Sequence, residues 1–398
     1  MLDFELTPNT KDMLAKIRDW SINEVRPHAH AAENLAHPPA VAEVVEKCPV
    51  RNCPLDFRFI GPGVRGREDD AEYARSLNGG GSVFGILAME EMNVGDGWGW
   101  QALPGNNLGE RAVRLLGNEA QVHKWADGIL RGEYHITSIC MTEEHCGLDL
   151  SQIKTTAVED GDHWVINGTK RFISHGAYAD YLVVFAQTQP GTGLKGVRAF
   201  IVEPADEGFS VLKYSEDKLG VRYYPNSTLE FKNVRVARDR VLASARFGQF
   251  MDILNGTRPF CAAIGLGTSK GMLEYATDWV MKNDRPLAPR RRARFDELVQ
   301  EMTAGLDRVR RMLLRAAWQH DQGEADPTWS HKAKGYALPI LEEVAFRSMQ
   351  IMGPEAWSKE HLMEKWYRDS KFGDIVEGTG NMHRIYVGRS EFSNALAA

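Results

Sequence analysis

Cysteine is scarce in this sequence of 398 residues, which contains only five, scattered along the chain: Cys48, Cys53, Cys140, Cys146 and Cys261. No pair has zinc-knuckle spacing with a second pair behind it, so we expect no metal site. An odd number of separated cysteines is also a poor basis for disulfides. Free thiols in a reducing cytoplasm are therefore the expected state.

Long apolar runs and a strong charge imbalance are also missing. No stretch approaches the roughly 18 uninterrupted apolar residues of a transmembrane helix. The first twenty residues are charged and helical in pattern, unlike a secretion signal. The formal net charge is −6 at pH 7, which gives no reason to expect nucleic acid or an anionic membrane as a partner. We therefore expect a cytoplasmic protein.

The sequence does have the profile of a globular protein, with 43% hydrophobic and 26% charged residues. Its length predicts two or three domains, and three regions differ in pattern. We predict a mostly α fold with a central β domain. The expected parts are an N-terminal helical domain at 1–132, a middle β barrel or sandwich at 133–240, and a C-terminal helical bundle domain at 241–398.

Helical periodicity covers the first and last regions. Residues 11–25 place Met13, Ile17, Trp20 and Val25 near one helix face. In the last region we predict a four-helix bundle from long helices at 246–282, 293–322, 330–353 and from about 380 onward. The arginine run PRRRAR at 289–294 opens one of these helices, and we expect it to be a solvated face rather than an anion site.

The middle region changes to the period-two pattern of strands. The stretches DYLVVFAQ, VRAFIVEP and STLEFKNVRV are rich in β-prone residues. In HWVINGTKRFISHG, the pair Asn167-Gly168 separates two short β-prone runs. This pair predicts a hairpin turn.

An acidic residue in an unusual place directs attention to the C-terminal region. Residues 374–389 read DIVEGTGNMHRIYVGR, where Glu377 follows an apolar pair and precedes Gly378, Thr379 and an amphipathic run. Three further stretches are distinctive: ICMTEEHCGLD at 139–149, INGTKRFISHG at 166–176 and LNGTRPFCAAIGLG at 254–267. Together they make the chain, from about residue 81 onward, resemble the acyl-CoA dehydrogenase family, flavoenzymes that desaturate acyl thioesters.

The resemblance implies FAD as the cofactor and assigns residues to it. Met141, Thr142 and Gly147 match a strand end and loop that wrap the flavin, although Leu148 replaces the usual serine. The trio that matches the aromatic-Ile-hydroxyl pattern beside the flavin ring is Phe172, Ile173 and Ser174. An aromatic ring can cover a flavin face, and hydroxyl and backbone N–H groups can bond its reducible edge.

The resemblance also assigns a catalytic base. Family members carry the catalytic glutamate at one of two positions, which here hold Thr257 and Glu377. Because Thr257 cannot be a base, Glu377 is the one candidate, and it would abstract the α-proton of the thioester. Arg258 matches a position behind the thioester and Asn255 one on the CoA side, while Gly378 leaves room for substrate. Ile375 and Val376 are expected to desolvate Glu377.

Thr379 is expected to cap the last helix and to contact FAD through that helix start.

The motifs that a second subunit contributes match the family less well. In the family a second subunit completes the FAD site with an Arg-x-x-Phe-Gly segment and a Gln…Gly-Gly loop. Gln350 and Gly353 match the loop, but Asn283 stands at the arginine position and 286–287 read Pro-Leu. Either Arg285 or the 290–292 cluster substitutes, or a homologous subunit donates the arginine.

The expected function is FAD-dependent dehydrogenation of an acyl-CoA, with an electron-transferring flavoprotein or similar acceptor. The assembly would be a homo-oligomer, a dimer or tetramer, or a hetero-oligomer sharing its FAD site. A carrier-protein thioester dehydrogenase or an oxidase of the same fold is the alternative. The acyl group stays open. Trp98 and Trp100 could line its pocket or pack in the core.

Overall fold

The computed structural model describes residues 5–34, 41–49, 81–102, 108–244, 247–283, 289–323 and 326–397. They divide into two compact units. Unit 1 comprises 1–103, 219–223 and 255–398, and unit 2 comprises 104–218 and 224–254. The three-domain division at 132 and 240 stays a prediction, since both boundaries lie inside unit 2.

Unit 1 begins with short helices that enclose one buried cluster. They are α1 Pro8–Trp20, η1 Ser21–Val25, η2 Arg26–His28, α2 Ala29–Ala32, α3 Val41–Glu46, α5 Gly81–Gly95 and α6 Gly97–Ala102. Ile17, Trp20 and Val25 are buried as predicted, and Met13 packs against the same cluster. Trp98 is buried there too, and its indole N–H donates to Val25 O at 2.9 Å, so it is a core residue.

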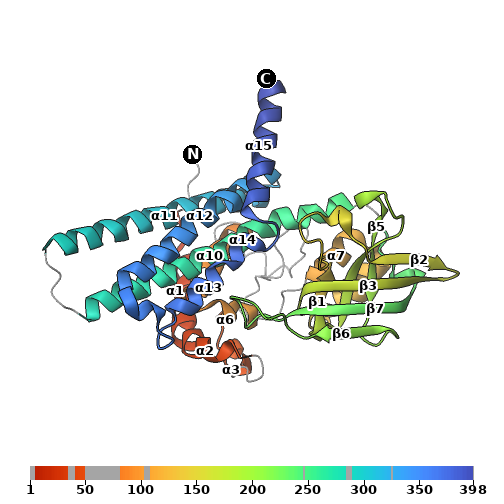
Figure 1. Ribbon diagram of the computed structural model, residues 1–398, viewed down its shortest axis with the longest axis horizontal. Coiled ribbons are helices and arrows are strands. Elements are labelled where there is room, and N and C mark those ends of the chain that lie inside the picture. The colour runs from red at the N-terminus through yellow and green to blue at the C-terminus, as the bar shows by residue number, and fades with distance from the viewer. Residues whose placement is uncertain are drawn as a thin grey trace. The chain divides into compact units, whose positions relative to one another are not determined.

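The C-terminal part of unit 1 is helical (Figure 1). Its elements are α10 Phe247–Lys282, which unit 1 includes from residue 255 onward, α11 Pro289–Asp321, α12 Pro327–Met352, η8 Gly353–Trp357, α13 Met363–Ser370, α14 Phe372–Ile375 and α15 Gly380–Ala397. The four long helices lie where the sequence predicted them. Aliphatic residues of α5, α10, α11 and α12 form the second buried cluster of this unit.

Unit 2 opens with helices and continues as a sheet. The helical pieces are α7 Leu108–Leu116, α8 Glu119–Gln121, η3 Val122–Ala126, α9 Asp127–Leu130, η4 Leu150–Gln152, η5 Gly176–Tyr178, η6 Gly193–Gly196 and η7 Arg238–Arg240. The Asn118 side chain caps α8 by accepting from the backbone N–H of Gln121. The Gln121 side-chain oxygen in turn accepts from the backbone N–H of Asn118. This reciprocal capping box fixes where the helix starts.

The described strands of unit 2 form one curved seven-stranded sheet (Figure 1). They are β1 Thr137–Cys140, β2 Thr156–Asp160, β3 His163–Ser174, β4 Tyr181–Gln187, β5 Val197–Val202, β6 Phe209–Lys213 and β7 Asn226–Ala237. The order is β1-β4-β2-β3-β7-β6, with β5 paired to β4. Every residue of β4 is buried, and alternate side chains enter two separate apolar clusters. A strand covered on both faces needs its unbroken apolar sequence.

The predicted hairpin turn at Asn167-Gly168 is wrong, because both residues lie inside the single strand β3. The register to β7 shifts between Ile166 and Gly168. Asn167 faces two residues of β7, Lys232 and Asn233, so β7 carries a β-bulge opposite the pair. Gly168 has φ 152°, and a Cβ there would lie 2.4 Å from Thr155 Oγ1. The Asn167 side chain accepts from the backbone N–H of Asn233 at 2.9 Å. Residues typical of a turn therefore lie inside a strand here, opposite a bulge of the partner strand.

The structure bears on two expectations drawn from composition, one about membrane spans and one about cysteines. No described helix is long and apolar enough to cross a membrane. Cys140, Cys146 and Cys261 are free thiols, while Cys53 lies outside the described residues.

The bulge yields a stability prediction. Gly168→Ala should lower the free energy of unfolding by roughly 3 kcal/mol, because the added methyl meets Thr155 in a backbone conformation that disfavours a Cβ. Gly161→Ala is the matched control, since Gly161 has φ 57° but open space around it, and should cost only about 1 kcal/mol. Chemical denaturation of both variants measures the difference. Equal losses would contradict the bulge explanation.

Candidate active site

Glu377 occupies the short connection between α14 and α15 in unit 1. Its backbone is left-handed, with φ 54°, and Gly378 follows with φ 98°. A Cβ on Gly378 would meet the movable end of the Met382 side chain, at 2.3 Å from Cε, and the positive φ itself disfavours a side chain at this position. Asp374 Oδ1 accepts from the Gly380 N–H at 3.0 Å, and Thr379 Oγ1 from the Met382 N–H at 3.4 Å. The predicted cap at Thr379 is confirmed.

Residues of α10 meet the Glu377 side chain and backbone. Thr257 Oγ1 donates to Glu377 Oε2 at 2.8 Å, and Arg258 Nε to Glu377 O at 3.4 Å. Arg258 also donates to Asn255 Oδ1 at 2.5 Å. The structure therefore brings Asn255, Thr257 and Arg258 together with Glu377, although their sequence separation is about 120 residues.

A proline inside α10 fixes this arrangement. Pro259 has no N–H, so the carbonyl of Asn255 four residues earlier loses its helical donor. Ser330 Oγ on α12 replaces that donor and lies 2.6 Å from Asn255 O. Arg258 and Asn255 thus sit where α10 is tied to α12.

Lys334 on α12 is a site residue that the sequence interpretation missed. Its side chain is fully buried, and Nζ donates to Val376 O and, at 2.6 Å, to Gly378 O. The ammonium therefore holds the peptide carbonyls on both sides of Glu377. The signal available in the sequence was a lysine three residues after His331 on a helix otherwise facing the core, which places both on one face.

A pair of buried histidines extends this network. Arg258 Nη1 lies 3.3 Å from His331 Nε2, His331 Nδ1 lies 2.7 Å from His383 Nδ1, and His383 Nε2 lies 3.0 Å from Gly378 O. Arginine only donates, so His331 Nε2 accepts and its Nδ1–H donates onward. His383 then carries its proton on Nε2 and donates to the carbonyl. This series of hydrogen bonds therefore runs in one direction, from Arg258 to Gly378 O.

Burial and the two cations keep these histidines neutral. Burial, together with Arg258 and Lys334, lowers the pKa of His331 to about 3. The same groups and the neighbouring imidazole lower the pKa of His383 to about 3. Burial also lowers the pKa of Lys334, against the attraction of Glu377. Burial and the Glu377 carboxylate raise the pKa of the Cys261 thiol, which is therefore protonated at neutral pH.

One sequence expectation about this region needs correction. The side chain of Ile375 is 70% exposed, so Ile375 does not desolvate Glu377, because it ends α14 facing solvent. Arg258, which the resemblance placed behind the thioester, is 1% exposed. The Glu377 carboxylate accepts from a hydroxyl, and two basic side chains lie near it.

The residues assigned to the flavin ring lie in unit 2, at the end of β3. Phe172 has φ 58° and exposes 48% of its surface, while Ile173 is buried in the sheet core. Ser174 Oγ bonds Asn226 Nδ2 at 3.2 Å, and Ser174 O accepts from Ser138 Oγ at 2.6 Å. An exposed aromatic ring on a left-handed backbone is an arrangement that proteins keep for contacts.

The loop after β1 lies beside this segment. Arg171 N–H donates to Thr142 O at 2.9 Å, and the buried Lys170 ammonium donates to Met141 O at 3.0 Å. Lys170 also forms an ion pair with Glu143 at 2.8 Å, so one buried ammonium holds two residues of this loop. Gly147 is exposed, and a Cβ on it would make only an ordinary contact with Thr142. The structure therefore shows no crowding at Gly147 among the described residues.

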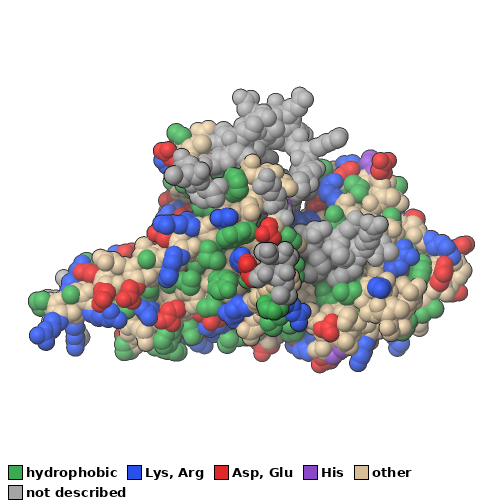
Figure 2. All heavy atoms as spheres, turned by 90° about the horizontal axis from the view of Figure 1, so that it is seen from above, with side chains coloured by type: hydrophobic (Ala, Val, Ile, Leu, Met, Phe, Trp, Pro, Cys, Tyr) green, Lys and Arg blue, Asp and Glu red, His purple; other side chains and the backbone are tan. Residues whose placement is uncertain are grey.

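The remaining cofactor candidates belong to unit 1 and lie away from Glu377 along the chain. Gln350 is exposed, and Gly353 ends α12 with φ 82° and open space around it. Asn283 is exposed, while Arg285 and 286–287 lie outside the described residues. The arginines at 290–292 are exposed as predicted, and Figure 2 shows Lys and Arg side chains gathered at the end of unit 1 where α11 begins.

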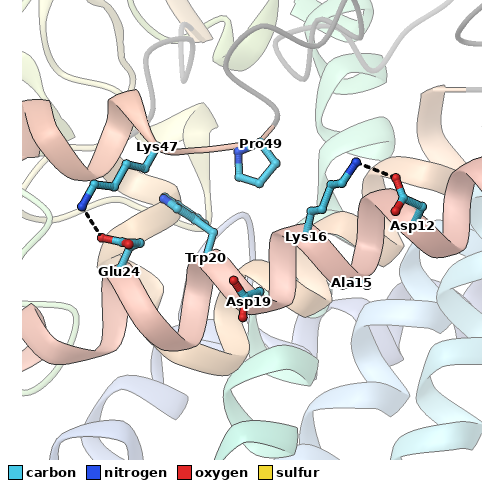
Figure 3. A pocket seen from close by; sticks show the side chains of 8 residues that line it. All are labelled: Asp12, Ala15, Lys16, Asp19, Trp20, Glu24, Lys47 and Pro49. Atoms are coloured by element: carbon cyan, nitrogen blue, oxygen red, sulfur yellow. Dashed lines mark hydrogen bonds and ion pairs between the residues drawn. The ribbon is translucent and has the colours of Figure 1, made fainter.

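Two other features carry none of the predicted residues. Figure 3 shows a hollow beside α1 in which Lys16 pairs with Asp12 and Lys47 with Glu24. In unit 2, Glu143, His145 and Cys146 lie close enough together to hold a cation. However, the Glu143 carboxylate accepts from Lys170 and from the N–H groups of 154 and 155, so its oxygens are already used.

Comparison with known proteins places the chain. Residues 138–234 match the acyl-CoA dehydrogenase middle-domain model, and residues 247–392 match the C-terminal-domain model. The chain belongs to the acyl-CoA dehydrogenase family. Its matches to both models include the Glu377 loop, the Thr257–Arg258 turn and the Phe172 segment.

Relatives of the family align along nearly the whole chain. The short-chain-specific acyl-CoA dehydrogenase of Clostridium acetobutylicum is 29% identical over 392 residues, covering 97% of this chain and 98% of the relative. Cyclohex-1-ene-1-carbonyl-CoA dehydrogenase of Geobacter metallireducens is 33% identical over 261 residues, covering 64% and 68%. Acyl-CoA dehydrogenases are flavoproteins that act on acyl-CoA substrates, so this chain is an oxidoreductase of that class.

Solved structures agree with the fold. Butyryl-CoA dehydrogenase from Megasphaera elsdenii is similar with a TM-score of 0.82 and 25% identity, covering 98% of this chain and 100% of that chain. A chain in the structure reported for the electron transferring flavoprotein of Acidaminococcus fermentans has a TM-score of 0.80 and 25% identity, covering 98% and 99%. The predicted α, β, α order is confirmed as that of an acyl-CoA dehydrogenase.

The neutral histidines predict acid-sensitive stability. In the unfolded chain they take up protons below about pH 6.5, whereas in the folded protein they resist protonation until about pH 3. The unfolded state therefore binds more protons in this window, and the free energy of unfolding falls as the pH falls through it. His383→Gln should reduce the slope by up to about 1.4 kcal/mol per pH unit between roughly pH 6 and 4.

The measurement is urea denaturation at several pH values, with His123→Gln as the control. The His123 side chain is 80% exposed, so its removal should leave the slope unchanged. A His383→Gln variant with the wild-type slope would show that His383 is not held neutral.

Proposed function

We propose that this chain is an FAD-dependent acyl-CoA dehydrogenase in which Glu377 abstracts the α-proton of the thioester. One observation supports this most strongly. Thr257 Oγ1 lies 2.8 Å from Glu377 Oε2, so the two positions at which the family places its base adjoin each other here. Of the two, position 377 has the carboxylate. A carboxylate that is anchored and oriented is what general-base catalysis requires.

The surroundings of Glu377 suit the charge changes of this reaction. Removing the α-proton moves negative charge from the carboxylate to the thioester oxygen. Arg258 and Lys334 are buried basic side chains that interact with the Glu377 charge. Fixed cations near developing negative charge lower the barrier without further reorganisation. Asn255 and Gly378 are the other residues proposed to contact the substrate.

The residues present fit an isoalloxazine and its dinucleotide tail. Phe172 offers an exposed ring on a left-handed backbone, and Ser174 a hydroxyl held by Asn226. When bound, FAD would supply the acceptor for the β-hydride. The residues proposed to hold it are Met141, Thr142, Gly147, Phe172, Ile173, Ser174, Gln350, Gly353 and Thr379.

The relatives support the nature of the substrate and the electron acceptor. Those described above are named for short-chain, butyryl and cyclohexenecarbonyl CoA esters, which favours a CoA thioester over a carrier-protein thioester. The likeness to a chain of the Acidaminococcus fermentans structure favours an electron-transferring flavoprotein as the acceptor.

Glu377→Gln tests the base directly. The variant should fold and keep its flavin, because glutamine has nearly the same shape and can accept the Thr257 hydrogen bond. Its rate of flavin reduction by a panel of acyl-CoA substrates should fall by at least about a thousandfold, since an amide cannot take the proton. Stopped-flow absorbance of the flavin measures this. The control is Glu360→Gln, an exposed glutamate of the same unit, and a Glu377→Gln rate close to this control would exclude Glu377 as the base.

The assembly alternative generates a second prediction. Asn283 lacks the charge that would bond a pyrophosphate, while Gln350 is exposed and available to another subunit. If a homologous subunit donates the arginine, the chain expressed alone should bind well under one flavin per subunit and recover on co-expression with that subunit. Flavin content and sedimentation measure this. Full flavin occupancy with good turnover in a homo-oligomer would exclude the hetero-oligomer and leave the arginines at 290–292 or Arg285 as the substitutes.

A further inference from the structure

Three consecutive backbone carbonyls around Glu377 accept hydrogen bonds from buried side chains. Val376 O accepts from Lys334 Nζ, and Glu377 O from Arg258 Nε at 3.4 Å. Gly378 O accepts twice, from Lys334 Nζ at 2.6 Å and from His383 Nε2 at 3.0 Å. Such convergence of carbonyls is possible because the backbone at 377 and 378 is left-handed.

A left-handed backbone at a residue with a Cβ costs free energy and persists only where its surroundings enforce it. At Glu377 the carbonyl bonds are the enforcing contacts. If the carbonyls of 376 and 378 were released, the segment could return to an extended or helical conformation. The carboxylate would then leave Thr257. The groups that hold the carbonyls therefore determine where the carboxylate lies.

We propose that Lys334, His331 and His383 are positioning residues that hold the Glu377 carboxylate in place through the carbonyl groups on either side of it. This inference rests on the proposed role of Glu377 as the base. Lys334 acts directly on both carbonyls, and the histidine pair acts as a directional link from Arg258 to Gly378.

The burial of Lys334 argues against a role in packing alone. Its ammonium is fully buried, and within the described part of the chain no carboxylate pairs with it at ion-pair distance. A buried charge without such a pair is costly, and an apolar side chain of similar size would fill the same space more favourably. The charge is retained where two carbonyls need a donor.

The histidine pair adds direction because each ring has one donor and one acceptor when neutral. The charged or titratable groups that act on the pair are Arg258 from α10, Lys334 from α12 and Tyr386 from α15. Cys261, Asp374 and Glu377 interact in turn with these basic side chains. Arg258 and Lys334 are cations close to the rings, so a second proton on either ring is disfavoured. The donor-to-acceptor direction of the hydrogen bonds from Arg258 to Gly378 is thereby fixed across the neutral pH range.

The first test needs no substrate. In protein labelled with ¹⁵N-histidine, His331 should carry its proton on Nδ1 and His383 on Nε2, and neither should titrate between pH 5 and 9. Signals are assigned from the peaks lost in His331→Gln and His383→Gln. The opposite tautomer at either ring, or titration in this range, would overturn the link from Arg258 to Gly378.

The second test separates positioning from packing. Lys334→Met removes the charge and keeps the length, and Lys332→Met is its control, two residues away on α12 with a partly exposed side chain. His383→Leu removes the donor to Gly378 O, whereas the amide of His383→Gln can replace it. Lys334→Met and His383→Leu should each lower kcat at least roughly tenfold with KM within about threefold, as expected for a lost hydrogen bond to a buried carbonyl. His383→Gln should retain most of the activity.

The outcomes distinguish this inference from the proposed function. If Glu377→Gln is inactive while Lys334→Met and His383→Leu keep the wild-type kcat, positioning by these residues is wrong and the base assignment stands. If Glu377→Gln is active, the base assignment itself fails. If His383→Gln is as damaged as His383→Leu, the donor to Gly378 O is not what matters, and the inference fails. Should Lys334→Met not fold, the comparison of His383→Leu with His383→Gln still decides whether the donor to Gly378 O positions Glu377.

Discussion

The buried ammonium of Lys334 is the interaction on which the geometry of the candidate base depends. It binds the carbonyls of Val376 and Gly378, and so draws the connection between α14 and α15 against α12. Gly335, the next residue of α12, allows this approach, since a Cβ there would lie 3.1 Å from His383 Cβ. A single lysine and the glycine beside it thus fix both the loop and the first turn of the last helix.

Prolines within two helices of unit 1 contribute in a second way. Pro259 in α10 frees the carbonyl of Asn255, which Ser330 then bonds at 2.6 Å. Pro339 in α12 likewise removes the donor for Gly335 O, and Arg384 Nη1 lies 3.5 Å from that oxygen. In both cases a neighbouring helix supplies the missing donor. The helices around Glu377 are therefore joined by backbone-directed bonds as well as by apolar packing.

Features that depend on a local sequence pattern could be predicted from the sequence. Apolar periodicity located the four long helices and strand β4, and the pairing of Thr257 with a glutamate at 377 indicated that the two motifs act together. Signals failed where a residue type serves more than one purpose. Asn167-Gly168 has the sequence of a turn yet lies inside a strand, opposite a bulge in β7, because only the partner strand decides between the two. The spacing of His331 and Lys334 indicates a shared helix face but not a role, since their roles come from carbonyls that are distant in sequence.

Ile375 shows why an apolar neighbour is a poor guide to the environment of a carboxylate. The side chain is 70% exposed, whereas the Glu377 carboxylate accepts from Thr257. Arg258 and Lys334 bond the backbone carbonyls of 376–378. In the proposed reaction, Glu377 loses its negative charge when it takes the α-proton, while Arg258 and Lys334 stay near it. Their positive charge would then be available to the negative charge on the thioester oxygen. The same side chains that bond the left-handed loop would therefore also favour the product of the proposed proton transfer, so the fold of the loop and its proposed chemistry share one cause.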